Sequence, residues 1–185
     1  MARMMGYGRA FQDMKINVHI SGRQGPEGIR KAYQRLSPEA RNCITIENEE
    51  NAWGLDDCLT LSDLLPIVLD IHHHWVNSGE YLDASDERVQ RVIASWRGNR
   101  PTLHYSVSRE DCLVDHCVDT LPNRDVLITE GKNKQKLRAH SDYYWNEAVN
   151  NWALSFLDKF DMMCESKGKN LASFALYEQA KELDI

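Results

Sequence analysis

Short apolar runs alternate along the chain with longer stretches in which apolar and polar residues mix. Five of these runs are rich in β-branched and large apolar residues and are bounded by polar or turn-forming residues. Runs of this length and composition are typical of strands buried in a sheet. We therefore expect strands at residues 15–21, 43–49, 66–72, 101–106 and 159–166.

The stretches between these runs have helical periodicity. Residues 26–36 begin with a proline, which is favoured at the first position of a helix, and place their apolar side chains on one stripe. Thr60 and Ser85 are expected as N-caps of two further helices. Strands that alternate with helices in this way are typical of βα units around a parallel sheet. The expected helices lie within 26–36, 60–66, 85–98, 141–159 and 170–183.

Residues 107–138 interrupt this alternation. The segment is polar and longer than an ordinary crossover, so we interpret it as an insertion or excursion from the sheet. Its basic end, "GKNKQKLR", makes Lys132, Lys134 and Lys136 candidates for contacts with DNA phosphates. The alternative is a run of charge that is simply solvated.

Composition limits the class of protein. The chain has 185 residues, 42% hydrophobic and 27% charged, which favours a single globular domain. It has no apolar window long enough for a membrane span and no signal-peptide pattern at its start, so we expect a cytoplasmic protein with no membrane partner. A net charge of −6 gives no general attraction to nucleic acid. Binding to DNA would therefore need a local basic patch or bound cations.

Every expected strand ends near a histidine or an acidic residue. In parallel α/β folds the carboxyl ends of the strands carry the chemistry. A single histidine in such a place is more often structural, but several carboxylates buried together need cations to neutralise them. Mixed imidazole and carboxylate ligands suit Mn, Zn or Fe better than Mg or Ca. A polynuclear metal centre is therefore predicted from His19, Glu47, Asp70, His73, His104 and Glu165.

The run "DIHHH" raises the question of which histidines belong to that centre. Asp70 and His73 have the spacing D-x-x-H, so a strand that continues into a loop can turn both side chains toward one cavity. We expect His72 and His74 to support the site from outside the ligand set.

With these residues in view, the chain resembles the ultraviolet-damage endonucleases, relatives of endonuclease IV and of the xylose-isomerase-like TIM barrels. The resemblance rests on "INVHISGRQG", "ENEE", "LPIVLDIHHH", "LHYS", "RAHSDYY" and "FDMMCESKGK", in that order. It implies a (β/α)₈ barrel with up to three divalent ions, usually Mn²⁺, with Mg²⁺ or Zn²⁺ as alternatives. It also implies incision of damaged double-stranded DNA 5′ to ultraviolet photoproducts.

The resemblance extends the set of site residues. His140 in "RAHSDYY" falls on a metal-binding position of the family, as do the six residues predicted from the strand ends. Glu47 and Glu165 are expected to be catalytic by holding the ions that activate water. Lys167 and Lys169 in "ESKGK" are candidate phosphate contacts. Thr102 is a departure, because the family typically has a lysine there.

Length is the larger departure from the family. A (β/α)₈ barrel needs about 250 residues, and only strands four to eight of the family pattern are recognised here. Residues 1–185 are therefore predicted to be the C-terminal part of a single TIM-barrel endonuclease domain. Such a slice has two open sheet edges, which favour self-association or the binding of a missing N-terminal half.

Three functions are compatible with this sequence. The leading hypothesis is a metal-dependent DNA-repair endonuclease. A sugar isomerase or epimerase of the same superfamily would share the barrel and the metal carboxylates. The third is a truncated, inactive metal-binding fragment that needs a partner half. An incision assay on photoproduct-bearing DNA, with Mn²⁺ and with EDTA, separates them.

Overall fold

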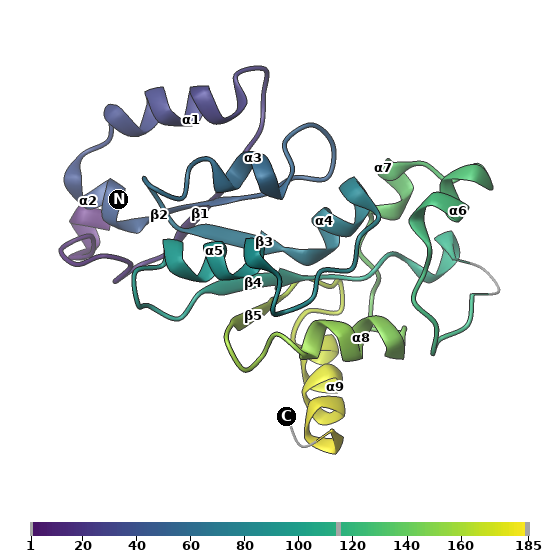
Figure 1. Cartoon of the computed structure of the whole chain (residues 1–185). Coiled ribbons are helices and arrows are strands. Elements are labelled where there is room, and N and C mark those ends of the chain that lie inside the picture. Colours follow the sequence, from purple (N-terminus) through teal and green to yellow (C-terminus); the bar gives the residue numbers. More distant parts are fainter. Residues whose placement is uncertain (1, 114–115, 184–185) are drawn as a thin grey trace.

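A computed structural model describes residues 2–113 and 116–183 of the chain. These residues form a five-stranded parallel sheet with the strands in sequence order (Figure 1). All five strands expected from the sequence are confirmed, each shorter than the apolar run that predicts it. They are β1 (Ile16–His19), β2 (Ile44–Glu47), β3 (Ile67–Asp70), β4 (Thr102–Tyr105) and β5 (Asp161–Cys164).

Helices connect the strands and cover the sheet (Figure 1). The helices predicted within 26–36 and 170–183 are confirmed within one residue or two of their ends. Two short helices that follow directly on other elements were not predicted, those at 38–43 and 71–78. The set comprises η1 (Ala2–Met5), α1 (Gly25–Gln34), α2 (Pro38–Cys43), α3 (Leu55–Leu59), α4 (Ile71–Ser78), α5 (Glu87–Ser95), η2 (Glu110–Cys112), α6 (Arg124–Thr129), α7 (Lys134–Leu137), α8 (Glu147–Leu154) and α9 (Lys169–Glu182).

Among the described residues one predicted helix is absent, and two others begin at a different residue. The expectation of a helix within 60–66 is wrong, because α3 ends at Leu59 with Thr60 as its C-cap and residues 60–64 form turns. Asp86 rather than Ser85 caps α5. The helix expected over 141–159 begins only at 147, because the Asn146 side chain accepts the amide of Val149. Short polar side chains compete for these positions, and the sequence alone does not rank them.

The register of the sheet brings the strand ends to one edge. His19 is opposite Glu47, and Asp70 is opposite His104. The central strand β3 is buried along its whole length, whereas the edge strands β1 and β5 are partly exposed. An apolar core supports the strands whose ends carry the site residues. Its buried side chains include Ile46, Leu69, Leu103, Tyr105, Phe156 and Phe160.

The segment 107–138 packs as a folded subregion beside α4. It contains η2, α6 and α7, and its residues 114–115 lie outside the described part of the chain. A second apolar cluster joins it to α4 through residues such as Trp75, Val76, Leu127 and Leu137. Figure 1 shows α6 and α7 beyond the end of the sheet, next to α4. That the segment is an insertion relative to the family stays a prediction.

No helix in the described residues combines the length and apolar character that crossing a membrane requires.

Candidate metal centre

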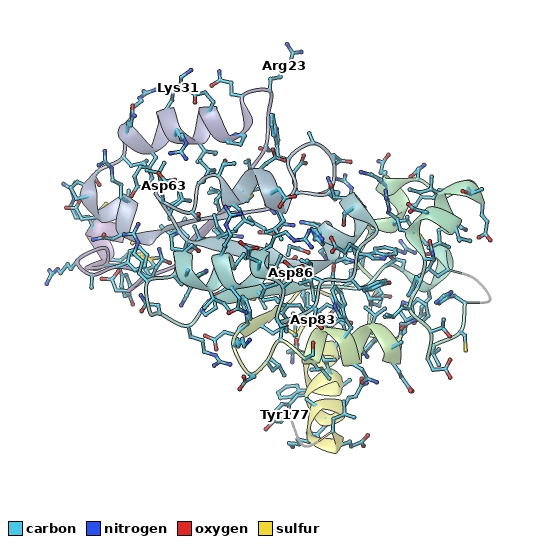
Figure 2. The ribbon with its side chains drawn as sticks, in the orientation of Figure 1. Arg23, Lys31, Asp63, Asp83, Asp86 and Tyr177 are labelled. Atoms are coloured by element: carbon cyan, nitrogen blue, oxygen red, sulfur yellow. The ribbon has the colours of Figure 1, made fainter. Side chains whose placement is uncertain are left out.

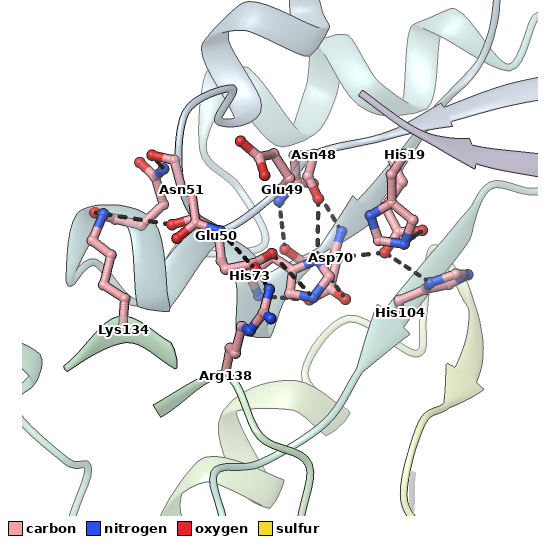
Figure 3. Close-up of polar contacts among 12 residues, drawn as sticks. His19, Asn48, Glu49, Glu50, Asn51, Asp70, His73, His104, Lys134 and Arg138 are labelled. Atoms are coloured by element: carbon pink, nitrogen blue, oxygen red, sulfur yellow. Dashed lines mark hydrogen bonds and ion pairs between the residues drawn. The ribbon is translucent and has the colours of Figure 1, made fainter. Parts of the chain in front are cut away.

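Two overlapping groups of acidic and imidazole side chains meet at the carboxyl ends of the strands. Each group offers ligand atoms within 4.8 Å of one another. The larger group takes one side chain from the end of each of four neighbouring strands, as the parallel register requires. It consists of Glu47, Asp70, His104 and Glu165, and the smaller group consists of His19, Glu47 and His73. Figure 3 shows His19, Asp70, His73 and His104 of these groups.

Glu47 belongs to both groups. Its side chain is only 1% exposed, and its Oε1 lies 3.1 Å from His104 Nδ1 and 3.6 Å from His73 Nδ1. Its Oε2 lies 3.5 Å from His19 Nε2 and accepts a close hydrogen bond from Asn17. Glu47 would therefore be available as a ligand in both groups.

Asp70 ends β3 and also begins α4. One of its oxygens accepts the backbone amide of His73 at 2.7 Å, which makes Asp70 the N-cap of the helix. Its other oxygen, Oδ2, lies 3.3 Å from His73 Nδ1. The expectation that a loop follows Asp70 is therefore wrong: the first turn of α4 brings the Asp70 and His73 side chains together. An N-capping aspartate stabilises a helix start, so the strand passes directly into the helix.

Three buried polar atoms of the larger group, Glu47 Oε1, Asp70 Oδ2 and His104 Nδ1, make no well-aligned hydrogen bond among the described residues. Each nevertheless lies within 3.3 Å of an oppositely charged or polar atom of the cluster, so they are grouped as close ion pairs and not as aligned hydrogen bonds. Buried polar atoms without a well-aligned partner point to a water or an ion that completes the site. Burial raises the pKa of Asp70 to about 7, because a carboxylate removed from water is costly to ionise. This donor set of oxygens and imidazole nitrogens fits a divalent first-row ion.

His104 carries a strongly held proton when no ion is bound. Burial acts to lower the pKa of His104, but Glu165 at 3.2 Å and Glu47 outweigh it and raise that pKa to about 10. The imidazolium therefore occupies the charge-neutralising role that a cation would take.

We predict that the affinity of the chain for Mn²⁺ rises with pH. A bound ion must displace the His104 proton. Below the raised pKa of about 10, each unit by which the pH falls therefore lowers the affinity for the ion about tenfold for each displaced proton. The same proton stabilises the metal-free fold fully below about pH 6.5, and that contribution is lost as pH rises toward 10. Calorimetric titration at pH 6.5 and 8.5 in two buffers measures both the affinity and the protons released. An affinity independent of pH, with no proton release, would contradict the assignment of His104.

The neighbouring histidines of "DIHHH" belong to neither group. His74 Nε2 contacts Glu80 at 3.3 Å and the Ser78 hydroxyl at 3.2 Å, on the far side of α4. His72 is buried against Trp75, with ring centroids 5.9 Å apart. Burial lowers the pKa of His72 to about 3, so it is neutral at physiological pH.

The remaining predicted site residues lie around the edge of these groups. His140 lines a pocket of about 510 Å³ together with His19 and His73 but belongs to neither group. Its role as a metal ligand stays a prediction. Lys167 and Lys169 are exposed where the chain leaves β5 and enters α9.

The three lysines of the basic segment are not equivalent. The Lys134 ammonium donates to the backbone carbonyls of Glu50 at 3.5 Å and Asn77 at 3.2 Å, so it fastens α7 to the loop after β2. Lys132 and Lys136 line a separate hollow of about 410 Å³ with Arg109. Their role as phosphate contacts stays a prediction.

Sequence reasoning missed two residues of the "ENEE" block that shape the site. The Asn48 side chain exchanges two hydrogen bonds of 2.9 Å with the backbone of Asp70, which fixes the loop after β2 against β3. Glu50 is a third buried carboxylate, 5% exposed, and is paired with Arg138. Their position directly after Glu47 was the available signal, but acidic loops are usually exposed.

The fold and the site together define a class: a TIM-barrel-like α/β protein with a candidate divalent-metal centre at the carboxyl ends of its strands. The chain belongs to the UV-endonuclease UvdE family, whose family model matches residues 2–185.

The names of similar curated proteins agree with membership of that family. The chain is 24% identical over 174 residues to a UV DNA damage endonuclease of Bacillus cereus strain B4264, covering 89% of this chain and 48% of that protein. It is 26% identical over 177 residues to a UV-damage endonuclease of Schizosaccharomyces pombe, covering 89% of this chain and 26% of that protein. The chain thus spans about half the length of the Bacillus relatives that it matches, and less of the fungal one.

A solved structure confirms the fold. The crystal structure of SacUVDE superimposes with a TM-score of 0.65 at 23% identity, over 92% of this chain and 52% of that one. The five-stranded sheet is accordingly a partial TIM-barrel-like fold, as the sequence predicts.

Proposed function

We propose that this chain is part of a divalent-metal-dependent DNA-repair endonuclease that incises the backbone 5′ to ultraviolet photoproducts. Membership of the UvdE family supports the substrate class. The observation that carries the proposal is the convergence of Glu47, Asp70, His104 and Glu165, whose ligand atoms lie within 4.8 Å of one another at the carboxyl ends of the strands. The cytoplasmic location expected from the sequence stays a prediction.

Each residue of the candidate metal centre has a separate role in the proposed reaction. Bound divalent ions, Mn²⁺ being the first choice, would activate a water and stabilise charge on the phosphodiester. Glu47 and Glu165 would hold the ions beside His104, because one oxygen of each lies close to His104 Nδ1, at 3.1 and 3.2 Å. Asp70 Oδ1 is held by the backbone amide of His73 at the start of α4. This hydrogen bond would orient the other oxygen, Oδ2, toward the ions. The exposed His19 side chain would close the open side of the site nearest to solvent.

Damaged double-stranded DNA is the proposed partner. The net charge of −6 makes local basic groups important. Lys132 and Lys136 line a hollow that shares Gln135 and Ala139 with the pocket beside the candidate metal centre. A strand whose scissile phosphate lies at the metals could therefore place a neighbouring phosphate in that hollow.

Incision of irradiated and undamaged duplexes, with Mn²⁺ and with EDTA, tests the proposal. Because the chain spans about half of its Bacillus relatives, we expect weak nicking that requires Mn²⁺, with little preference for damaged DNA. Absence of any Mn²⁺-dependent nicking would contradict the proposal and favour an inactive metal-binding fragment. Isomerisation or epimerisation of a sugar under the same conditions would instead favour the sugar-enzyme alternative.

We also predict that the chain self-associates when it is purified alone. Among the described residues β1 and β5 each pair with a single neighbour. The outer face of α9 exposes Leu171 (63%), Phe174 (63%) and Tyr177 (56%), and Figure 2 shows Tyr177 projecting from the end of the fold. Open edges beside exposed apolar side chains favour association.

Sedimentation of two variants measures this effect. Phe174→Glu should shift the chain toward the monomer, whereas Gln90→Glu, which adds the same charge on the exposed surface of α5, should behave as wild type. A wild-type chain that stays monomeric at high concentration would show this prediction to be wrong.

A further inference from the structure

Glu50 is a buried carboxylate that belongs to neither group of ligands described above. It follows Glu47 by three residues, in the loop that leaves β2. Its side chain lines the pocket that also contains His19, His73 and His140. A buried acid at a site of this kind needs either a cationic partner or a bound ion.

The two oxygens of Glu50 have different surroundings. Oε1 accepts a close hydrogen bond from the Arg138 guanidinium and a second, of 2.9 Å, from the Asn51 amide. Oε2 instead lies 3.8 Å from His73 Nε2. One oxygen is thus fixed by protein donors, and the other is presented to the pocket.

The hydrogen bonds of His73 identify which of its nitrogens can bind an ion. Nδ1 lies 3.1 Å from the carbonyl oxygen of Asn48, and a carbonyl only accepts, so Nδ1 carries the hydrogen. The nitrogen left with a lone pair in neutral His73 is Nε2. That atom faces Glu50 Oε2.

Two basic side chains from α7 hold Glu50 in position. Arg138 and Lys134 are four residues apart, one helical turn. Arg138 binds the carboxylate of Glu50, and Lys134 binds its carbonyl oxygen at 3.5 Å. Figure 3 shows both side chains reaching from α7 to this loop. The basic segment therefore holds the acid in place before any ligand arrives.

We propose that Glu50 Oε2 and His73 Nε2 form a cation subsite, with His19 on its open side and Arg138 as its positioning residue. The separation of 3.8 Å allows one first-row divalent ion to reach both atoms, since such ions bind nitrogen and carboxylate oxygen at about 2.0–2.2 Å. His19 is close enough to contribute, with its ring centroid 5.4 Å from that of His73. The subsite rests on the proposed metal dependence and adds a ligand, Glu50, to it.

Counting bound Mn²⁺ tests the subsite without an activity assay. Wild type, Glu50→Gln and Glu49→Gln are titrated with Mn²⁺, and the free ion is followed by electron paramagnetic resonance. Glu49 lines the same pocket, but its Oε1 is occupied by the backbone amides of Ala52 and Trp53, so it is a matched control. Glu50→Gln should lose one bound ion or weaken its binding at least about 10–100-fold, the cost of losing an outer partner of a metal ligand. Glu49→Gln should match wild type.

A second variant separates positioning from folding. Arg138→Gln keeps the carboxylate and removes its anchor, so it should weaken the same ion and leave the other binding unchanged. Thermal melting in EDTA shows whether either variant has lost its fold. Unchanged Mn²⁺ stoichiometry and affinity in Glu50→Gln would overturn the subsite alone. A wild-type chain that binds no Mn²⁺ would instead overturn the metal dependence on which it rests.

Discussion

Replacing Glu47 by glutamine is expected to abolish tight binding of divalent ions to this chain. Glu47 is the residue that both ligand groups share, and its two oxygens face different histidines. An amide is neutral and has one acceptor oxygen, so Glu47→Gln removes the charge and one of the two donor atoms. Loss of an outer partner already costs about 10–100-fold in metal affinity. Loss of the central carboxylate should therefore lower the affinity for Mn²⁺ at least about 100-fold, and Mn²⁺-dependent nicking should be lost in parallel.

The control for this variant is Glu87→Gln, an identical change at an exposed position in the first turn of α5. Elemental analysis after gel filtration gives the metal content of both proteins. Retention of wild-type metal content by Glu47→Gln would contradict the role of this carboxylate as the ligand shared by both groups.

The second large effect is expected at Asp70. Asp70→Asn keeps a side-chain oxygen that can cap α4 but removes the charge. Because Asp70 is fully buried, the metal-free variant should be as stable as wild type or more stable, while its metal content falls sharply. His74→Ala should behave in the opposite way. It loses contacts to Glu80 and Ser78, so stability falls while metal content is kept.

Metal content by elemental analysis and melting temperature in EDTA together distinguish the two variants. Equal loss of metal in Asp70→Asn and His74→Ala would contradict the view that only one of these side chains faces the ions.

The arrangement of the site was predictable because it follows from topology. Apolar runs alternating with helices indicate a parallel sheet, and a parallel sheet brings the ends of its strands together. Glu47, Asp70, His104 and Glu165 each stand at such an end, so their convergence needed no knowledge of side-chain packing.

What the sequence did not indicate depends on contacts between distant segments. Arg138 and Glu50 are 88 residues apart, and their pairing turns an ordinary acidic loop residue into a buried one. Lys134 belongs to a charged run that the sequence suggests is solvated. Its ammonium nevertheless donates hydrogen bonds to the backbone carbonyls of Glu50 and Asn77. The start of α4 was missed for a local reason, since "DIHHH" has no pattern that separates a capped helix from a loop.

Anomalous diffraction from crystals soaked in Mn²⁺ locates any bound ions directly. We expect a strong peak among Glu47, Asp70, His104 and Glu165, at about 2.0–2.3 Å from their nearest ligand atoms, a range typical of first-row divalent ions. A crystal saturated with Mn²⁺ that shows no peak there, or peaks only on the outer surface, would contradict the proposed metal centre.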